Sequence, residues 1–323
     1  MRFNIFFLLF FCLFTNSAIS QLIDCSSTFK SKSNAYFCFH YDNDYFTKTD
    51  EYYSQGIALE LVHPAVRKLP VTKLLVKSKS SEYKYGILIN HFVYTPTSIS
   101  SDEILYGDRP FSANVTISSF VNSKDTLHHR LISSSITIGI IGQAAGGKEI
   151  QQTIHRWLNN RQPHGWQNQI QNDMILTYQV NYEKRLVNLP KKFLLNIASD
   201  IKLGTHTDNL KAGFNFMAGK FNDPYQPAYI THNNRKKIKC YLYGQVQPGI
   251  TFYDATLKGG LFNISSPYTI PVSEIKHFTI QADYGIVLSF RKIYLEYRQS
   301  ILTKEFSYGH YHRWGGISIG VDL

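Results

Sequence analysis

The feature that most constrains the fold is an alternation of apolar and polar residues that recurs in long segments. In one of them Ile293, Leu295 and Tyr297 alternate with polar or charged neighbours. Many segments reach about ten residues or more, the length that a tilted membrane-spanning strand requires, whereas strands of soluble sandwiches are usually shorter. The segments cover residues 34–43, 54–63, 84–94, 110–122, 129–141, 173–187, 193–205, 209–220, 238–253, 277–290, 291–302 and 312–323. The sequence therefore predicts an all-β fold, a 12-stranded antiparallel transmembrane β-barrel.

Aromatic content agrees with a barrel. The chain has 22 Tyr and 22 Phe, only 18% of its residues are charged, and no segment beyond the N-terminal region is apolar enough for a membrane-spanning helix. Outer-membrane barrels carry girdles of aromatic residues at both membrane interfaces. A soluble periplasmic binding protein is the remaining all-β alternative, and it would be found in the soluble fraction.

The N-terminal segment has the pattern of a targeting sequence. Arg2 precedes the apolar run 5–14, "IFFLLFFCLF", and the small residues of "SAIS" precede Gln21. A spanning helix needs roughly 20 apolar residues, so this run is too short to be one. We expect residues 1–20 to be a cleaved signal peptide, with an uncleaved anchor as the alternative. Residues 21–323 are expected to form one domain, integral to a bacterial outer membrane.

Few cysteines remain beyond that segment. Cys25, Cys38 and Cys240 are too few for a disulfide scaffold in a chain of this size. There is no Cys-x-x-Cys pair, so a zinc ribbon is excluded. Cys25 and Cys38 can pair in an oxidising compartment, and the sequence leaves that pairing open.

One segment has a helical period instead. Residues 147–162, "GKEIQQTIHRWLNNRQ", predict an amphipathic helix on a loop, with Gln151 and His155 one turn apart on the same face. The apolar positions are Ile150, Ile154, Trp157 and Leu158. Long structured loops of barrels commonly carry function. A lone histidine on a helix is nevertheless more often a packed or surface residue than a base.

Oxygen-bearing side chains crowd the stretch 41–56, "YDNDYFTKTDEYYSQG". They are Asp42, Asn43, Asp44, Asp50 and Glu51. An EF-hand counted from Asp42 fails, because Thr47 and Tyr53 stand where a glycine and an acid are needed. A looser oxygen cluster can hold Ca²⁺, and a polar turn between two strands is the alternative.

Two further features bear on function. The chain has no His-x-Ser pair of the kind expected in a serine–histidine outer-membrane phospholipase, so we expect hydrolysis, if any, to use base-activated water. The basic segment 224–239 is either a solvated loop or a contact for phosphorylated lipid head groups.

Three blocks in order carry a family resemblance: "YDNDYFTKTDEYYSQGIALEL", "YGDRPFSA" and "IGIIGQAAGGKEIQQTIHRWLNNRQPHGWQNQI". Together they resemble the outer-membrane lipid A 3′-O-deacylases of the LpxR family. The resemblance implies a 12-stranded barrel with a Ca²⁺-dependent esterase site near its extracellular end, between the barrel wall and a loop helix.

The resemblance also implies roles for single residues. His155 is similar to the family's general base, and Gln151 lies where it can orient the base or the water. Asn43 and Asp44 match the family's pair beside the metal, and Ser54 falls where the family commonly has Thr. We expect these oxygen donors to hold a hard cation, Ca²⁺, facing His155 across the barrel mouth.

Asp108 and Arg109, in "GDRPF", match a family motif whose role can be structural. The implied function is hydrolysis of the 3′-linked acyl or acyloxyacyl ester of lipid A. The implied partners are lipid A or lipopolysaccharide and outer-membrane lipids, with no nucleic acid, and the protein is expected to be a monomer. A phospholipase-type esterase and a non-catalytic barrel or porin remain alternatives.

Overall fold

The computed structural model describes residues 33–47, 51–79, 82–190, 192–226 and 238–323. The predicted signal peptide 1–20, Cys25 and most of the basic segment 224–239 lie outside these ranges. Twelve strands form the fold: β1 (Tyr36–Asn43), β2 (Tyr52–Val62), β3 (Glu82–Thr95), β4 (Ser112–Asp125), β5 (Arg130–Ile141), β6 (Asp173–Leu189), β7 (Phe193–Gly204), β8 (Thr207–Lys220), β9 (Lys239–Asp254), β10 (Phe278–Phe290), β11 (Ile293–Leu302) and β12 (His312–Asp322).

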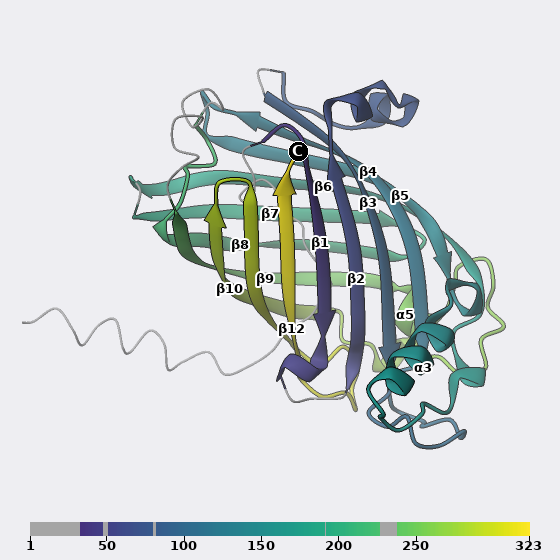
Figure 1. The fold of residues 1–323 in the computed structure, drawn as a ribbon. Coiled ribbons are helices and arrows are strands. Elements are labelled where there is room, and N and C mark those ends of the chain that lie inside the picture. The colour runs from purple at the N-terminus through teal and green to yellow at the C-terminus, as the bar shows by residue number, and fades with distance from the viewer. Residues whose placement is uncertain (1–32, 48–50, 80–81, 191, 227–237) are drawn as a thin grey trace, which may run out of the picture.

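The strands close into a single antiparallel barrel (Figure 1). Each strand pairs with its neighbours in sequence, and β1 pairs with β12, with Tyr36 opposite Asp322 and Asn43 opposite Gly315. The predicted 12-stranded barrel is confirmed, and each predicted segment overlaps one strand. Within the described ranges, no helix is long and apolar enough to cross a membrane.

The helices and turns lie in the connections. They are α3 (Gly147–Trp157), α5 (Ala255–Lys258), and the 3₁₀ turns η1 (Asp44–Thr47), η2 (Pro64–Lys68), η3 (Pro70–Leu74), η4 (Gln143–Ala145), η5 (Trp166–Asn168) and η7 (Val272–Glu274). The predicted helix 147–162 begins as expected and ends earlier, at Trp157.

The two ends of the barrel differ. Both η1 and α3 lie at one end, while the C-terminus and the connection between β2 and β3 lie at the other (Figure 1). The end with α3 carries most of the longer connections, including residues 96–111, 142–172 and 255–277. Outer-membrane barrels have long extracellular loops and short periplasmic turns, so α3 lies at the extracellular end.

Alternation along each strand separates a lipid-facing wall from the lumen. On β9, Leu242, Val246 and Ile250 are exposed on the outside, while Tyr241 and Gln247 are buried toward the inside. Glycines permit close approach where large side chains cross the lumen: a Cβ at Gly86 would lie 2.2 Å from Cζ of Phe120.

Side chains fill the lumen near both ends. Toward the periplasmic end lies an apolar cluster of Tyr36, Cys38, Val62, Phe120, Leu131, Leu194, Met217, Phe221, Tyr225, Tyr241, Val287 and Tyr294. Toward the extracellular end lies a second cluster of Tyr53, Phe92, Tyr94, Leu302 and Trp314. Between them is a polar cavity of about 130 Å³ lined largely by Asn, Ser and Thr side chains.

Candidate active site on the outer wall

Helix α3 packs against the outside of the barrel wall. Its first residue, Gly147, is so close to β4 that a Cβ there would lie 2.3 Å from Cβ of Ala113. The next residue on β4, Asn114, lines the lumen cavity, so Ala113 faces outward. On β3, the outward-facing His91 is bonded through Nε2 to the carbonyl of Ala145, 3.0 Å away.

A buried apolar cluster holds this arrangement together. It joins both strands to the loops on either side of α3 and contains Val93, Ile99, Phe111, Ala113, Ala145 and Trp166. Burial of such side chains contributes roughly 1.5–3 kcal/mol each. The helix is therefore fixed on the wall, and its position is not that of a free loop.

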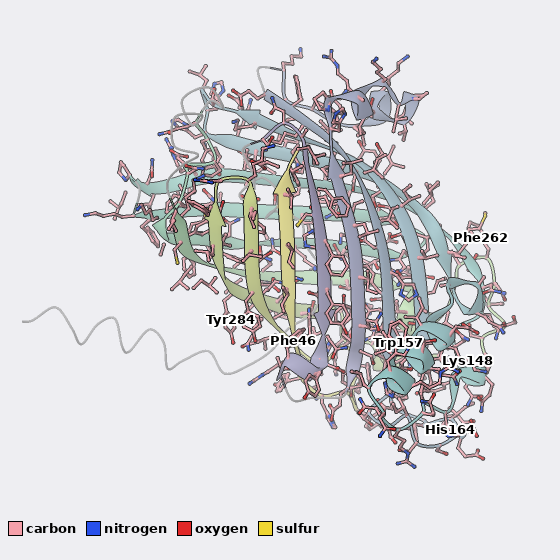
Figure 2. All side chains as sticks on the ribbon, in the orientation of Figure 1. Phe46, Lys148, Trp157, His164, Phe262 and Tyr284 are labelled. Atoms are coloured by element: carbon pink, nitrogen blue, oxygen red, sulfur yellow. The ribbon has the colours of Figure 1, made fainter. Side chains whose placement is uncertain are left out.

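The apolar side of α3 is not the side that packs. Gly147 and Gln151 are buried against the wall, while Trp157 is 81% exposed and Leu158 64% exposed. Figure 2 labels Trp157 on the helix, at the same end as Phe46 of η1. The helix is amphipathic as predicted, but of its apolar positions Ile150 and Ile154 are only half-buried, and Trp157 and Leu158 face away from the protein.

His155 has a defined tautomer. Its Nδ1 lies 2.5 Å from the carbonyl oxygen of Arg161. A carbonyl only accepts, so Nδ1 carries the proton and donates it. In the neutral imidazole the other nitrogen, Nε2, then has a lone pair, and within the described residues it makes no hydrogen bond. This is the state that a general base requires.

Gln151 holds the segment that follows the helix. Its side-chain oxygen Oε1 accepts a hydrogen bond of 2.8 Å from Nε1 of Trp166, and both groups are buried. Trp166 packs in turn on Phe111, with ring centroids 5.0 Å apart. Gln151 therefore holds the segment after α3, and His155 bonds to Arg161 of the same segment. Its predicted role in orienting the base or the water stays a prediction.

Asp102 is a residue whose role the sequence did not predict. Its carboxylate accepts hydrogen bonds from the backbone of Gly165 and from the side chain of Gln167, both 3.1 Å long, and lies 3.4 Å from Nδ1 of His164. These groups, the Gln167 amide first, hold the pKa of Asp102 below its usual range. Asp102 thus fastens the loop between β3 and β4 to the segment after α3.

Asn43 and Ser54 meet at the ends of β1 and β2. The amide nitrogen of Asn43 donates to the carbonyl of Ser54 at 2.7 Å, and its oxygen accepts from the backbone N–H of Tyr45 at 2.8 Å. The hydroxyl of Ser54 lies 2.6 Å from that of Thr95 on β3. Because Thr95 shares the outward face of Val93, these groups lie along the same wall as α3.

The acidic residues of the stretch 41–56 do not form one cluster in the structure. Asp44 is buried in η1, directly after the extracellular end of β1. Asp42 turns into the lumen, where Arg298 donates to both of its oxygens at 2.7 and 2.8 Å. Glu51 lies 3.7 Å from Nδ1 of His310 in another loop, and Asp50 is outside the described residues.

The residues proposed for a metal fit calcium in donor type. Asp44 supplies a buried carboxylate, and Asn43 and Ser54 supply amide, hydroxyl and carbonyl oxygens, all of which Ca²⁺ accepts. Within the described residues, no group of three or more His, Cys, Asp or Glu side chains is placed to hold a metal. A calcium ion here would therefore also need backbone carbonyl or water oxygens.

The structure joins some of the predicted site residues and not others. Asn43 contacts Ser54, and Gln151 shares a helix with His155, but within the described residues no hydrogen bond links the two pairs. Both pairs lie at the outer wall near the extracellular end, Asn43 and Ser54 on β1 and β2 and the other pair on α3 against β4. Because α3 packs outside the barrel, His155 does not lie across the barrel mouth from Asn43 and Ser54. A cation that faces His155 stays a prediction.

Comparison with known proteins shows which family the chain matches. The model of the family described as "Outer membrane protein LpxR" matches residues 6–323. The chain belongs to the LpxR family. It is thereby one of a family of outer membrane proteins, in agreement with its closed barrel.

A solved structure of the same family has the same fold. LpxR from Salmonella typhimurium matches with a TM-score of 0.71 and 18% identity, over 89% of this chain and 100% of that one. Two weaker likenesses follow. The β domain of the Bordetella autotransporter BrkA has a TM-score of 0.48 and 6% identity, over 91% of this chain and 100% of that one. An outer membrane channel from Pseudomonas putida F1 has a TM-score of 0.45 and 10% identity, over 93% of this chain and 99% of that one. None of the curated proteins compared by sequence matches the chain.

In this LpxR-family barrel, Asp108 and Arg109 belong to the barrel mouth and not to the α3 site. Arg109 is buried, pairs with Glu305, donates to the hydroxyl of Thr256 at 2.6 Å and lies 4.2 Å from the ring centroid of Tyr94. Burial raises the pKa of Glu305 to about 7, although Arg109 lowers it. Asp108 accepts from Thr97 and from the backbone of Arg109. Both residues therefore have a structural role as part of the mouth's packing.

The LpxR-family lumen also holds a serine–histidine–glutamate arrangement that sequence spacing missed. Nδ1 of His40 lies 2.9 Å from the hydroxyl of Ser318, and Nε2 lies 3.3 Å from Glu60. All three are buried between the two apolar clusters, and Ser318 is in the middle of β12, whose backbone N–H groups pair with β1 and β11. Among the residues that the structure describes, strand pairing leaves no backbone donors near Ser318 to stabilise an oxyanion, so we assign this group to lumen packing.

Proposed function

We propose that this protein hydrolyses an acyl ester of lipid A, at the 3′ position, from the outer leaflet of the outer membrane. The observation that carries the proposal is the position of His155. It is half-buried on a helix fixed to the lipid-facing wall, with Nδ1 committed to Arg161 and Nε2 able to accept a proton. Family membership supports lipid A as the substrate.

The environment of α3 suits an amphiphilic substrate. Trp157 and Leu158 present apolar surface toward the membrane, where acyl chains would lie. Arg156 and Arg161 flank His155 and carry positive charge for the phosphorylated sugars. An ester at the boundary between chains and sugars would thus lie at the depth of His155.

In the proposed reaction, Nε2 of His155 removes a proton from water as the water oxygen adds to the ester carbonyl carbon. The tetrahedral intermediate then breaks its bond to the sugar oxygen, and the proton passes from His155 to that oxygen. The products are a free fatty acid and a sugar hydroxyl. Asn43, Asp44 and Ser54 would hold Ca²⁺, which when bound offsets negative charge on the carbonyl oxygen.

Gln151 does not touch the reacting atoms in this scheme. Because its oxygen already accepts from Trp166, it acts by positioning the loop that carries Arg161. We expect the protein to work as a monomer, since all of these residues come from one chain, and to reach the membrane after removal of residues 1–20.

The test is mass spectrometry of lipid A from outer membranes with and without the protein, in Ca²⁺ or in a chelator. A mass loss equal to the 3′ acyl or acyloxyacyl group, blocked by the chelator, is the expected result. Loss of an acyl group from another position would contradict the assigned ester. Loss that survives chelation would contradict the calcium assignment.

A phospholipase-type esterase is the second candidate, because a site on the lipid-facing wall also admits glycerophospholipids. The same extracts distinguish the two. Lysophospholipids that accumulate with an unchanged lipid A spectrum would favour the phospholipase and overturn the proposal.

A further inference from the structure

The connection between β2 and β3 is a second segment that lies on the outer wall, at the periplasmic end. Two 3₁₀ turns, η2 and η3, each begin at a proline, and the buried hydroxyl of Thr72 joins them by donating to the carbonyls of Arg67 and Leu69 at 3.0 and 2.8 Å. We refer to residues 63–79 as the strap. Figure 1 shows these turns at the end of the barrel opposite α3.

Contacts fix the strap against outward-facing side chains of four strands. Val66 and Leu75 pack in a buried cluster with Tyr85 and Val121, against which Ile87 and Ile136 also pack. The backbone is held as well: Val76 donates to the hydroxyl of Tyr178 on β6 at 3.0 Å, and its carbonyl accepts from Ser134 on β5 at 2.8 Å. The strap thus covers wall that would otherwise contact lipid.

The strap and α3 cover the same side of the barrel from opposite ends. On β3, Ile87 packs under the strap and His91 contacts the loop of α3, so only Ile89 between them is left exposed. At about 3.4 Å per residue, that uncovered stretch is only about 14 Å long. On β9, exposed apolar residues run from Leu242 to Phe252, about 34 Å along the strand.

These lengths place the strap in the membrane. For strands tilted by about 40°, the β9 band spans about 26 Å of membrane, close to the apolar band of about 25 Å typical of such barrels. The uncovered stretch of β3 spans only about 11 Å of it. The remaining depth on this side must be filled by what covers the wall, which is α3 above and the strap below.

The strap has the composition of an interfacial segment. Leu69, Leu74 and Val76 are exposed on its surface, where an aqueous segment would carry polar residues. Arg67, Lys68 and Lys73 are exposed beside them, and within the strap there is no acidic residue. A basic, apolar segment at this depth meets the phosphate level of the periplasmic leaflet.

We propose that the strap lies in the periplasmic leaflet and binds the head groups of anionic phospholipids through Arg67, Lys68 and Lys73. This site is separate from His155 and does not depend on the proposed reaction. Its effect is to anchor the side of the barrel that carries α3 at a set depth in the membrane.

The head-group test measures lipid binding to the full protein in phosphatidylethanolamine nanodiscs, by native mass spectrometry with phosphatidylglycerol as the probe. Arg67→Gln, Lys68→Gln and Lys73→Gln together should weaken phosphatidylglycerol binding on the order of 100-fold, since each such charge near a membrane contributes about fivefold. The matched control replaces Lys192, Arg291 and Lys292, exposed on two other turns at the same end, by Gln. Equal binding by the strap variant and the parent, or an equal loss in the control, would overturn the proposal.

A second measurement tests depth without altering charge. Leu74→Trp adds a fluorophore at a position that is 68% exposed, and Leu127→Trp adds one on the β4–β5 turn at the same end, 76% exposed. With brominated acyl chains in the bilayer, we expect added quenching relative to the parent at position 74 and none at position 127. An unquenched Trp at position 74 would show that the strap lies in water, and the proposal would fail.

Discussion

At the scale of single residues, the proposed function depends on the imidazole of His155. His155→Ala removes the proton acceptor, so we expect deacylation in isolated membranes to fall by about 10²–10⁴-fold, the usual contribution of a general base. The release of fatty acid per folded barrel is the quantity to measure.

The control for this change is His128→Ala, at a histidine on the β4–β5 turn at the opposite end of the barrel. It should leave the rate unaltered. Both variants should keep the heat-modifiable migration of a folded barrel. Full activity in His155→Ala would remove it from the mechanism.

A second prediction at this scale concerns the barrel mouth. Arg109→Met leaves Glu305 buried without its partner, which should cost about 3–5 kcal/mol in the free energy of unfolding. Removing Arg109 also removes the charge that lowers the pKa of Glu305, so the folded state prefers the protonated acid even more strongly. An acid whose pKa is raised on folding loses stability as pH rises, so the variant should unfold at lower urea concentration at pH 9 than at pH 6.

The matched comparison is Arg109→Met with Glu305→Gln, which removes both charges. It should recover part of the lost stability and show a weaker dependence on pH. If Arg109→Met were as stable as the parent at both pH values, the Arg109–Glu305 pair would contribute nothing to stability.

Some residues of the candidate site could be proposed from the sequence, and their partners could not. His155, Gln151, Asn43 and Ser54 were proposed from motifs that resemble a family, and the structure puts each pair on the outer wall. The partners that set their geometry were not found, because a carbonyl such as that of Arg161 has no sequence signature. The role of Asp102 was not found either, since its contacts join segments far apart in the chain.

At the scale of elements, the packing of α3 is the feature to test. Gly147→Ala places a methyl group 2.3 Å from Cβ of Ala113 and 2.8 Å from the Trp166 ring, so the helix must move from the wall. A shift of about 1 Å at a catalytic group can lower the rate by about 100-fold. We expect a reduced rate of fatty acid release with an unaltered barrel.

Glu149→Ala, on the exposed side of the same helical turn, is the control and should retain the rate. If Gly147→Ala were as active as the parent, the close fit of α3 on β4 would be irrelevant to function.

Strand positions were predicted well because period-2 alternation reports directly on which face of a barrel each residue occupies. The direction of α3 was not predictable in the same way. An amphipathic stripe such as Ile154 and Trp157 shows that two environments exist, but not whether the apolar one is protein or lipid. The strap was missed because its short turns, 3₁₀ in geometry, leave no period to detect.

At the scale of the whole molecule, the filled lumen argues against a channel. Two apolar clusters occupy the lumen, with a cavity of about 130 Å³ between them. We therefore expect planar bilayers that contain the protein to show no stepwise conductance of the porin type. A porin of known conductance, reconstituted in the same way, is the control, and open steps from this protein would contradict the filled lumen.

The placement of α3 on the outer wall has a consequence for kinetics. A substrate that reaches His155 from the side travels in the plane of the bilayer, and its bulk concentration has no direct meaning for the enzyme. What counts is its mole fraction among neighbouring lipids. Under the proposed reaction, diluting the membrane with inert lipid would slow turnover even when the total amount of substrate and the volume of buffer are unaltered.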